Sequence, residues 1–363
     1  MKDKYWIAFS SMEEIGGSSV EKLFKYYNYD IEKAYNCNLC DLKNIENISV
    51  KFAEKFLKLR DKTDPDKCLF EVTSRDINYL TLENNKYPKL LKEINNPPII
   101  LYYKGNLDCC NFEKTIAVVG SRKASSNGKQ SLKKIIDGFR NTDICIVSGL
   151  ALGIDTAAHK LAIENNLKTI GVIASGTDYI YPSQNKELYA QIENNNGLIF
   201  TEYYPTFRPL SFRFPQRNRI VTGLSFGTIV VEAAIKSGAL ISANLTLEQG
   251  RELMCIPGNI TNPNTEGIYK LLKSGATMIT ESNDVLEALN WEIKTEINTQ
   301  NDKFKYLSDE EQIIINLLQI EPIAFDTIQN KTKINTDELL TFLTMLELKG
   351  IINQVEGDRY TVC

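Results

Sequence analysis

Two groups of residues in this 363-residue chain have the types and spacing needed to bind phosphate. The first group is three glycine-containing turns: Gly120-Ser121-Arg122-Lys123, Ser148-Gly149-Leu150 and Ala174-Ser175-Gly176-Thr177. Glycine allows backbone N–H groups to approach an anion, and a following helix N-terminus adds positive potential. Three such turns in series, the first carrying two cationic side chains, predict a phosphate-binding site.

The second group is the arginine segment, by which we mean residues 207–222. It has no acidic residue, and it holds these cationic and aromatic side chains: Arg208, Arg213, Arg217, Arg219, Phe207, Phe212 and Phe214. Arginine binds phosphate with two parallel hydrogen bonds, and aromatic rings stack on bases, a combination typical of single-strand binders. The alternative is a solvated basic face over core phenylalanines. Because the segment leads into a predicted helix of the same α/β region, we favour nucleic-acid binding.

The overall charge limits where nucleic acid could bind. The formal net charge is −4 and the sequence pI is about 5.4, which argues against a generally basic DNA-binding surface. Salt screens each charge beyond about 8–10 Å, so a local basic patch on an acidic body remains possible. We therefore expect any binding to be confined to one surface.

The turns and the arginine segment must be positioned by a sheet. Apolar runs predict strands at 99–103, 115–119, 144–147, 169–173, 198–201, 228–231 and 253–256. Helices are predicted between them at 126–140, 154–164, 184–193, 218–224 and 242–250. This alternation predicts an α/β, Rossmann-like core with a mostly parallel sheet, whose strand ends bind ligands at the carboxyl edge.

Smaller modules are expected on either side of this core. Short amphipathic stretches predict a small helical domain at 1–66, with a tight turn at 16–19, before the Rossmann-like domain at 67–291. A polar linker at 292–305 precedes a winged-helix domain at 306–363, which has three helices and a hairpin. No apolar stretch follows the N-terminus and no run approaches the roughly 20 residues of a membrane span, so we expect a soluble, cytoplasmic protein.

Catalytic and metal-binding patterns are weak. Gln130 stands where a P-loop needs serine or threonine, and Cys37 and Cys40 have no second ligand pair. His159 and Asp155 share a helix face, but no nucleophile motif accompanies them. We predict no enzymatic activity, no cofactor and no metal. The alternative is a nucleotide-processing enzyme similar to nucleoside monophosphate glycosidases, suggested by the glycine turns and Glu232.

Taken in order, these motifs resemble the bacterial DNA-processing protein A family, DprA or Smf. The matching stretches are 116–122, 148–159, 214–220, 237–241, 247–252 and 256–258, and they include the sequence Phe214-Pro215-Gln216-Arg217-Asn218-Arg219. The likeness covers nearly the whole chain, since the helical N-terminal module, similar to SAM or helix-hairpin-helix domains, and the winged-helix end also resemble family members.

The resemblance implies a recombination mediator that binds and protects incoming single-stranded DNA, forms a homodimer, and helps load RecA during natural transformation. By motif, Gly120, Ser121 and Arg122 would hold backbone phosphate, and Arg217 to Arg219 would border the same pocket. The full predicted DNA-binding set is Gly120, Ser121, Arg122, Lys123, Gly149, Gly176, Phe214, Arg217, Asn218, Arg219 and Gly238.

This chain departs from the family pattern at several positions. Leu152 stands where relatives commonly have a basic residue, and Asn244 stands where many have arginine. A lost positive charge would weaken or reshape the DNA-binding surface. In the predicted third helix of the winged-helix domain, Lys349 is the only basic residue, beside Glu338 and Glu347. This favours a protein-contact module over a duplex-DNA regulator.

Overall fold

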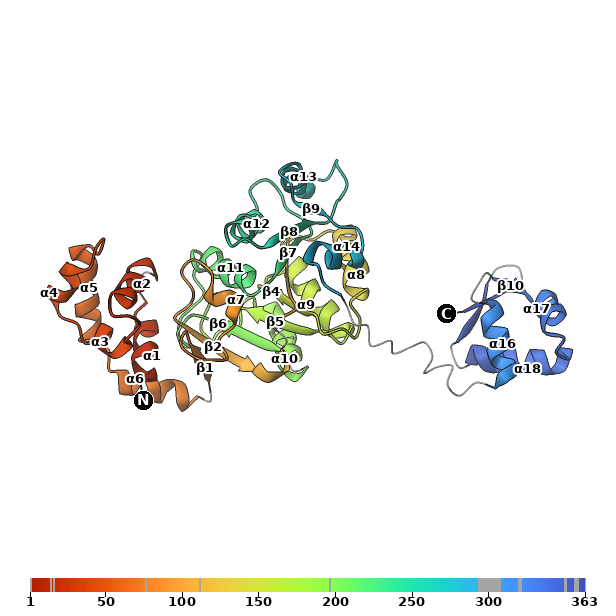
Figure 1. The fold of residues 1–363 in the computed structure, drawn as a ribbon, viewed down its shortest axis with the longest axis horizontal. Coiled ribbons are helices and arrows are strands. Elements are labelled where there is room, and N and C mark those ends of the chain that lie inside the picture. The colour runs from red at the N-terminus through yellow and green to blue at the C-terminus, as the bar shows by residue number, and fades with distance from the viewer. Residues whose placement is uncertain are drawn as a thin grey trace. The chain divides into compact units, whose positions relative to one another are not determined.

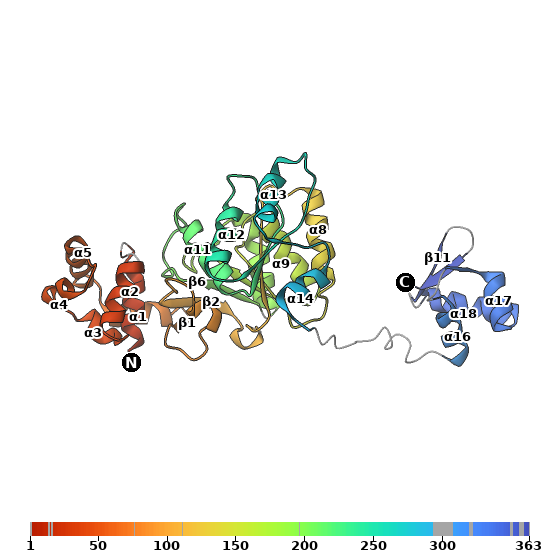
Figure 2. The same cartoon turned by 45° about the horizontal axis from the view of Figure 1, so that its top comes forward.

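The computed structural model describes residues 2–13, 15, 17–75, 77–110, 112–195, 197–292, 308–318, 322–348, 351–355 and 359–362. The chain forms two compact units, Met1–Ile293 and Lys294–Cys363 (Figures 1 and 2). Apart from Glu292, the predicted linker lies outside the described residues. Within the described ranges, we find no helix whose length and apolar character would let it cross a membrane.

The N-terminal module is helical, as predicted. Its helices are α1 (Asp3–Ser11), α2 (Gly17–Tyr26), α3 (Ile31–Tyr35), α4 (Leu39–Asn44), α5 (Val50–Arg60) and α6 (Pro65–Thr73). They pack around aromatic rings, among them Phe9 stacked on Phe56 with ring centroids 5.5 Å apart. The turn predicted at 16–19 is wrong in its second part, because residues 17–19 already form the first turn of α2. The predicted boundary after residue 66 lies inside α6, so we propose that this module extends to Thr73.

The core is a sheet of nine strands among the described residues, in the order β1-β2-β6-β5-β4-β3-β7-β8-β9. The strands are β1 (Asn78–Thr81), β2 (Ile100–Gly105), β3 (Thr115–Val119), β4 (Cys145–Ser148), β5 (Lys168–Val172), β6 (Leu198–Thr201), β7 (Gly227–Val230), β8 (Glu252–Cys255) and β9 (Thr277–Met278). In this spatial order, every neighbouring pair from β6 through β5, β4, β3, β7 and β8 to β9 is parallel. The pairs β1–β2 and β2–β6 are antiparallel. The mostly parallel Rossmann-like sheet is therefore confirmed.

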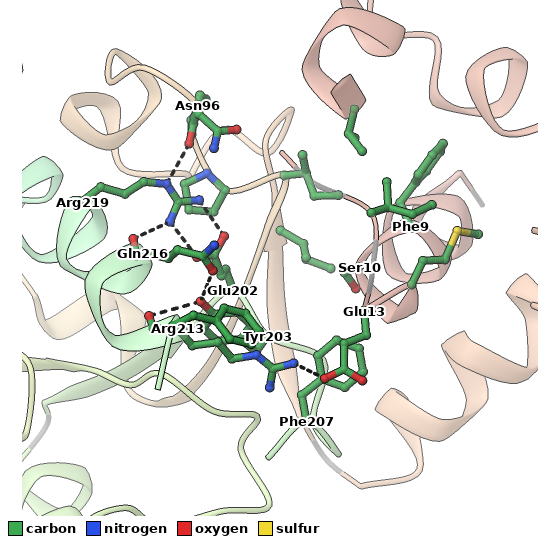
Figure 3. A pocket seen from close by; sticks show the side chains of 18 residues that line it. Phe9, Ser10, Glu13, Asn96, Glu202, Tyr203, Phe207, Arg213, Gln216 and Arg219 are labelled. Carbon is green, nitrogen blue, oxygen red and sulfur yellow. Dashed lines mark hydrogen bonds and ion pairs between the residues drawn. The ribbon is translucent and has the colours of Figure 1, made fainter. Parts of the chain in front are cut away.

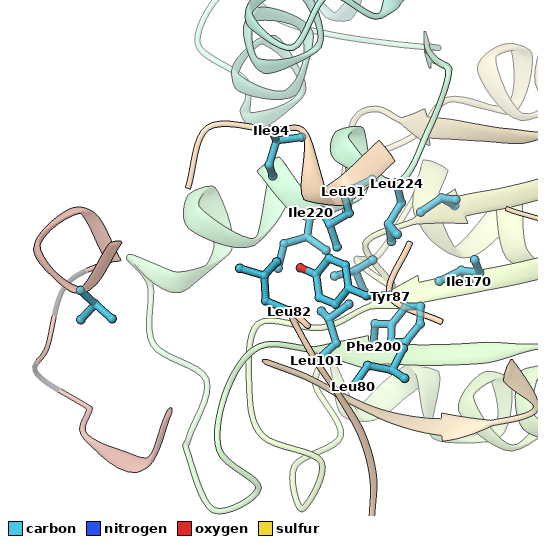
Figure 4. Close-up of a cluster of buried hydrophobic side chains, with 14 of the residues drawn as sticks. Leu80, Leu82, Tyr87, Leu91, Ile94, Leu101, Ile170, Phe200, Ile220 and Leu224 are labelled. Atoms are coloured by element: carbon cyan, nitrogen blue, oxygen red, sulfur yellow. The ribbon is translucent and has the colours of Figure 1, made fainter. Parts of the chain in front are cut away.

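Helices connect the strands and cover the sheet. They are α7 (Lys89–Lys92), α8 (Ser126–Asp137), α9 (Ile154–Glu164), α10 (Lys186–Asn194), α11 (Arg213–Gly223), α12 (Gly238–Glu248), α13 (Glu266–Lys273) and α14 (Ser282–Leu289), with short 3-10 turns at Leu107–Cys109, Ser183–Asn185 and Pro263–Thr265. Alternate residues of β3 enter different cores: Ile116 joins the cluster that contains α8 and α9, and Ala117 joins the one that contains α11. Figure 4 shows the cluster that contains α11, where Ile220 and Leu224 lie on the same side of Tyr87 as Leu91.

Helix α11 is longer than the helix predicted at 218–224. The helix begins at Arg213 rather than at Asn218, so most of the arginine-rich stretch is helical. Pro215 lies in the first turn, where the missing N–H would have no partner within the helix, and it therefore does not interrupt the helix. The edge strands β1 and β9 were not predicted.

The C-terminal unit has the predicted winged-helix fold. It contains α16 (Asp309–Leu318), β10 (Ile323–Ala324), α17 (Phe325–Thr332), α18 (Thr336–Leu348), β11 (Ile352–Val355) and β12 (Arg359–Val362). The strands pair antiparallel in the order β10-β12-β11 over a core that includes Ile314, Leu343 and Ile352. Lys349 lies outside the described residues.

Candidate nucleic-acid interface

The three glycine turns follow neighbouring strands, as predicted. β3 pairs with β4, and β4 pairs with β5, so the turns after these strands lie at the same carboxyl edge. β7 lies on the other side of β3, and the strand order therefore reverses there. Open α/β folds bind ligands at such a reversal.

Two of these turns do not offer their backbone donors to a phosphate. The carboxylate of Asp155 accepts hydrogen bonds from the N–H groups of Gly149 and Ala151, at 3.1 and 3.4 Å. The N–H of Gly176 donates to the Phe207 carbonyl at 2.7 Å. Burial raises the pKa of Asp155 despite the attraction of Arg217. In two of the three turns, backbone donors that were expected to bind phosphate are thus already bound to the protein's own acceptors.

A second carboxylate fills the anion position at the strand-order reversal. Glu232, which follows β7, accepts hydrogen bonds from the N–H and hydroxyl of Ser125 at 2.9 and 2.5 Å. Ser125 is the N-cap of α8, so a negative charge lies where the helix N-terminus favours one. The close fit is visible at Gly128, where an added Cβ would lie 2.7 Å from the Glu232 carboxyl carbon.

The predicted glycines serve close packing. A Cβ on Gly149 would lie 2.6 Å from the Arg217 guanidinium, and one on Gly120 would lie 2.6 Å from Ile154. A Cβ on Gly176 would overlap the carbonyls of the loop after β6. Gly238 is different: it is the exposed first residue of α12, and nothing lies near its Cβ position.

Cationic and aromatic side chains remain exposed beside these turns. Arg122 and Lys123 are exposed after β3, and the Lys123 N–H donates to the Ser121 hydroxyl at 3.1 Å. The Arg122 guanidinium carbon lies 5.5 Å from the centroid of the Phe214 ring on α11. The structure therefore brings together a predicted phosphate ligand and a predicted base-stacking ring. We call Arg122, Lys123, Phe214 and the adjoining Tyr181 the Arg122 surface.

Arg217 lies underneath this surface and not on it. Its side chain is 4% exposed, and it donates to the Gly149 carbonyl at 2.5 Å and to the Val172 carbonyl. Its Nε donates to the Asn218 side chain at 3.3 Å. The guanidinium thus ties the ends of β4 and β5 to α11, and the half-buried Asn218 lies beside it.

Arg219 does not border the Arg122 surface, contrary to prediction. It pairs with both carboxylate oxygens of Glu202 at 2.6 Å and donates to the Asn96 carbonyl at 3.1 Å (Figure 3). This pair lines a cavity of about 330 Å³, whose lining does not include Arg122 or Phe214.

Arg213 is buried beside the same cavity. Its guanidinium lies 4.8 and 4.9 Å from the Tyr203 and Phe207 ring centroids, and it pairs with Glu13 of the N-terminal module (Figure 3). Helical spacing separates the residues of this segment: those at 213 and 217 point into the protein, and Phe214, on another face, meets Arg122.

His159 is a core residue. Its Nδ1 lies 2.7 Å from the Thr169 hydroxyl, and burial together with the nearby Arg217 charge lowers its pKa to about 3. In the part of the chain that the structure describes, no group of three or more histidine, cysteine or acidic side chains could hold a metal ion.

The comparisons identify the family. A sequence profile described as DNA recombination-mediator protein A matches residues 78–290, more than half of the chain. The chain belongs to that family. A second profile of the family, the DprA winged helix domain, matches residues 305–358.

Individual relatives agree with this placement. Protein Smf of a Synechocystis species is 31% identical over 98% of both chains. DNA processing protein DprA of Streptococcus pneumoniae is 48% identical over 55% of this chain and 70% of its own length. A solved structure of the pneumococcal protein has a TM-score of 0.69 at 36% identity, covering 78% of this chain and 97% of its own. One of Helicobacter pylori DNA processing protein A, whose subject is single-stranded DNA binding, has a TM-score of 0.52 at 31% identity, covering 59% and 96%.

Sequence reasoning missed Tyr181. Its ring lies next to Phe214, with centroids 5.4 Å apart. The signal was an aromatic residue shortly after the third glycine turn, on the loop that leaves β5 at the ligand-binding edge.

Proposed function

We propose that this protein is a recombination mediator that binds single-stranded DNA on the Arg122 surface. The observation that carries the proposal is the exposed Arg122 guanidinium held over the Phe214 ring at the carboxyl edge of the sheet. Family membership and the single-strand-binding neighbour from Helicobacter pylori support it.

The chemistry suits a flexible single strand. A guanidinium and an ammonium group, from Arg122 and Lys123, attract successive phosphates, and the adjacent aromatic ring can stack on an unpaired base. In a duplex the bases are already stacked on each other, so an aromatic ring gains less. Binding limited to this surface is compatible with a chain whose net charge is −4.

A non-enzymatic role is favoured over a nucleotide-processing enzyme. Asp155 and Glu232 already accept hydrogen bonds from backbone or hydroxyl donors at the carboxyl edge of the sheet, where open α/β folds bind their ligands. Release of free base from a nucleoside monophosphate incubated with the protein would support the enzyme instead.

We further propose a homodimer that delivers the DNA to RecA in the cytoplasm, with natural transformation as one such setting. Exposed apolar side chains on α12 and on the edge strand β9 support such a self-association surface. Ile241 and Leu247 on α12 are 41% and 55% exposed, and Met278 on the edge strand β9 is 58% exposed. Exposed apolar side chains beside an unpaired strand edge are typical of an interface between subunits.

The dimer proposal can be tested with a charge on α12. Leu247→Glu should convert a sedimenting dimer into a monomer, because an interface of two copies would then bury two carboxylates. The exposed Leu340→Glu on α18 of the winged-helix unit is the matched control. A wild-type chain that sediments as a monomer at high concentration would refute the dimer.

The function itself is tested by binding of oligonucleotides over a range of salt. The wild type should prefer single strands to duplex, and Arg122→Ala should weaken single-strand binding about 10-fold on all sequences, with a log–log salt slope flatter by about 0.7. Arg140→Ala, an exposed arginine beyond the C-terminal end of α8, is the control that should change neither. Equal affinity for both DNA forms, or an Arg140 effect as large as that of Arg122, would contradict the proposal.

A further inference from the structure

Tyr181 extends the row formed by Arg122 and Phe214. The guanidinium of Arg122 lies on Phe214, and the Tyr181 ring meets the same phenylalanine with centroids 5.4 Å apart and planes inclined by 53°. Tyr181 is 48% exposed although it touches another ring. A large aromatic surface is therefore open to solvent at the ligand-binding edge of the sheet.

Two hydrogen bonds to neighbouring elements hold the loop that carries Tyr181 in place. The Tyr181 carbonyl accepts a hydrogen bond from the Tyr189 hydroxyl of α10 at 3.2 Å. A few residues later, the buried Asn185 amide donates to the Leu150 carbonyl at 2.9 Å, which joins this loop to the turn after β4. A ring presented from a fixed loop loses less conformational entropy when a ligand binds.

The neighbouring turns also expose apolar side chains. Ile180 and Leu152 are each 40% exposed. Leu152 precedes Gly153, whose close packing against the Ser121 and Arg122 carbonyls places it beside the cationic turn. Single exposed apolar residues are common and carry no meaning alone. Here Leu152 is next in sequence to Gly153, which packs on the Arg122 turn, and Ile180 is next in sequence to Tyr181, so both occur on segments that carry the Arg122 surface or pack against it.

We propose that the exposed ring of Tyr181 stacks on a nucleobase of the bound single strand. This rests on the proposed function: Arg122 binds a backbone phosphate, Phe214 contacts one base, and Tyr181 stacks on a base further along the strand. Stacking on an aromatic ring tolerates every base, because each base has a π face. Tyr181 thus contributes affinity that depends on bases and not on phosphates.

The test compares two strands of one length, an oligothymidylate and an abasic strand with the same phosphates. Tyr181→Ala should bind the oligothymidylate about 10-fold more weakly than the wild type does. On the abasic strand the two proteins should agree within about twofold, and the salt slope should be unchanged. Tyr181→Phe should retain wild-type affinity, because it keeps the stacking face.

Two controls separate stacking from a structural effect. Tyr26→Ala removes a tyrosine of equal exposure, 48%, which also contacts a neighbouring ring, and it should not alter DNA binding. A strand containing 2-aminopurine should lose fluorescence on the wild type and on Tyr181→Phe, and keep more of it on Tyr181→Leu.

The outcomes distinguish this inference from the proposed function. One outcome is that the wild type binds single strands, with Arg122→Ala weakening this binding and Tyr181→Ala leaving it unchanged. In that case the stacking role is wrong and the proposed function stands. Equal losses on both strands would also overturn it, since the ring would then only position Phe214 and Arg122. If the wild type binds no single strand, both proposals fail.

Discussion

The arginine after β3 and the arginines of α11 look alike in sequence, but they serve different purposes in the structure. Arg122 is exposed and rests on a ring, whereas Arg213 and Arg217 are 2% and 4% exposed and donate to protein acceptors. Arg219 is paired with Glu202. The number of arginines in a sequence segment therefore does not tell how many of them can bind DNA. The partners of each guanidinium decide whether a phosphate can reach it.

The largest expected effect comes from removing Arg217, one of the buried arginines of α11. Arg217→Ala should lower the free energy of unfolding by about 3 kcal/mol, because it leaves two buried carbonyls and Asp155 without the guanidinium. Urea denaturation monitored by circular dichroism measures this change. Arg122→Ala should change stability by no more than about 0.5 kcal/mol. If both variants unfolded at the same urea concentration, the division into buried and exposed arginines would be incorrect.

The second effect concerns pH and the buried side of the comparison. The folded-state pKa of His159 is about 3, below its ordinary value of about 6.5, so the unfolded state binds more protons between these values. The stability contributed by the neutral imidazole is complete above pH 6.5 and falls as pH decreases. From pH 7 to pH 5 the loss should be about 2 kcal/mol.

His159→Asn isolates this contribution, since other groups also titrate. Its unfolding free energy should fall less steeply with acidification, by about 2 kcal/mol over the same interval. Parallel pH profiles for the variant and the wild type would show that His159 is not buried in its neutral form.

The smallest expected effect tests whether DNA runs along the exposed turn that carries Arg122. Leu152→Lys adds a positive charge next to the Arg122 turn, so single-strand affinity should rise a few-fold and the salt slope should steepen by about 0.7. Leu152→Gln is the uncharged control. An unchanged slope would place the DNA backbone away from this turn.

The sequence was sufficient to predict the central strands of the core sheet and the adjacency of their ends, but not the edge strands β1 and β9. Near-continuous apolar runs such as those of β3 and β4 occur where a strand is buried on both faces, and parallel strands joined by helices bring their carboxyl ends together. The beginning of α11 was harder to predict, because Pro215 suggests a break unless the helix is known to start just before it.

Most partners of the buried arginines and carboxylates could not be predicted, since they come from distant parts of the chain. Glu13 and Arg213 are separated by 200 positions, and Ser125 and Glu232 by 107. Local patterns carry no information about such pairs. For the same reason the glycine turns suggested anion sites, although in the folded chain Gly149 donates to the Asp155 carboxylate and Gly176 donates to the Phe207 carbonyl.

The two internal carboxylates have a consequence for how the protein behaves in a cell. An open phosphate site at the carboxyl edge of a Rossmann-like sheet can bind a free nucleotide, which would then compete with DNA. With Asp155 and Glu232 bound to the donors of those sites, a mononucleotide has little to hold it. A single strand that makes several weak contacts along one surface does not need such a site, so we expect free nucleotides to compete poorly with DNA for this protein.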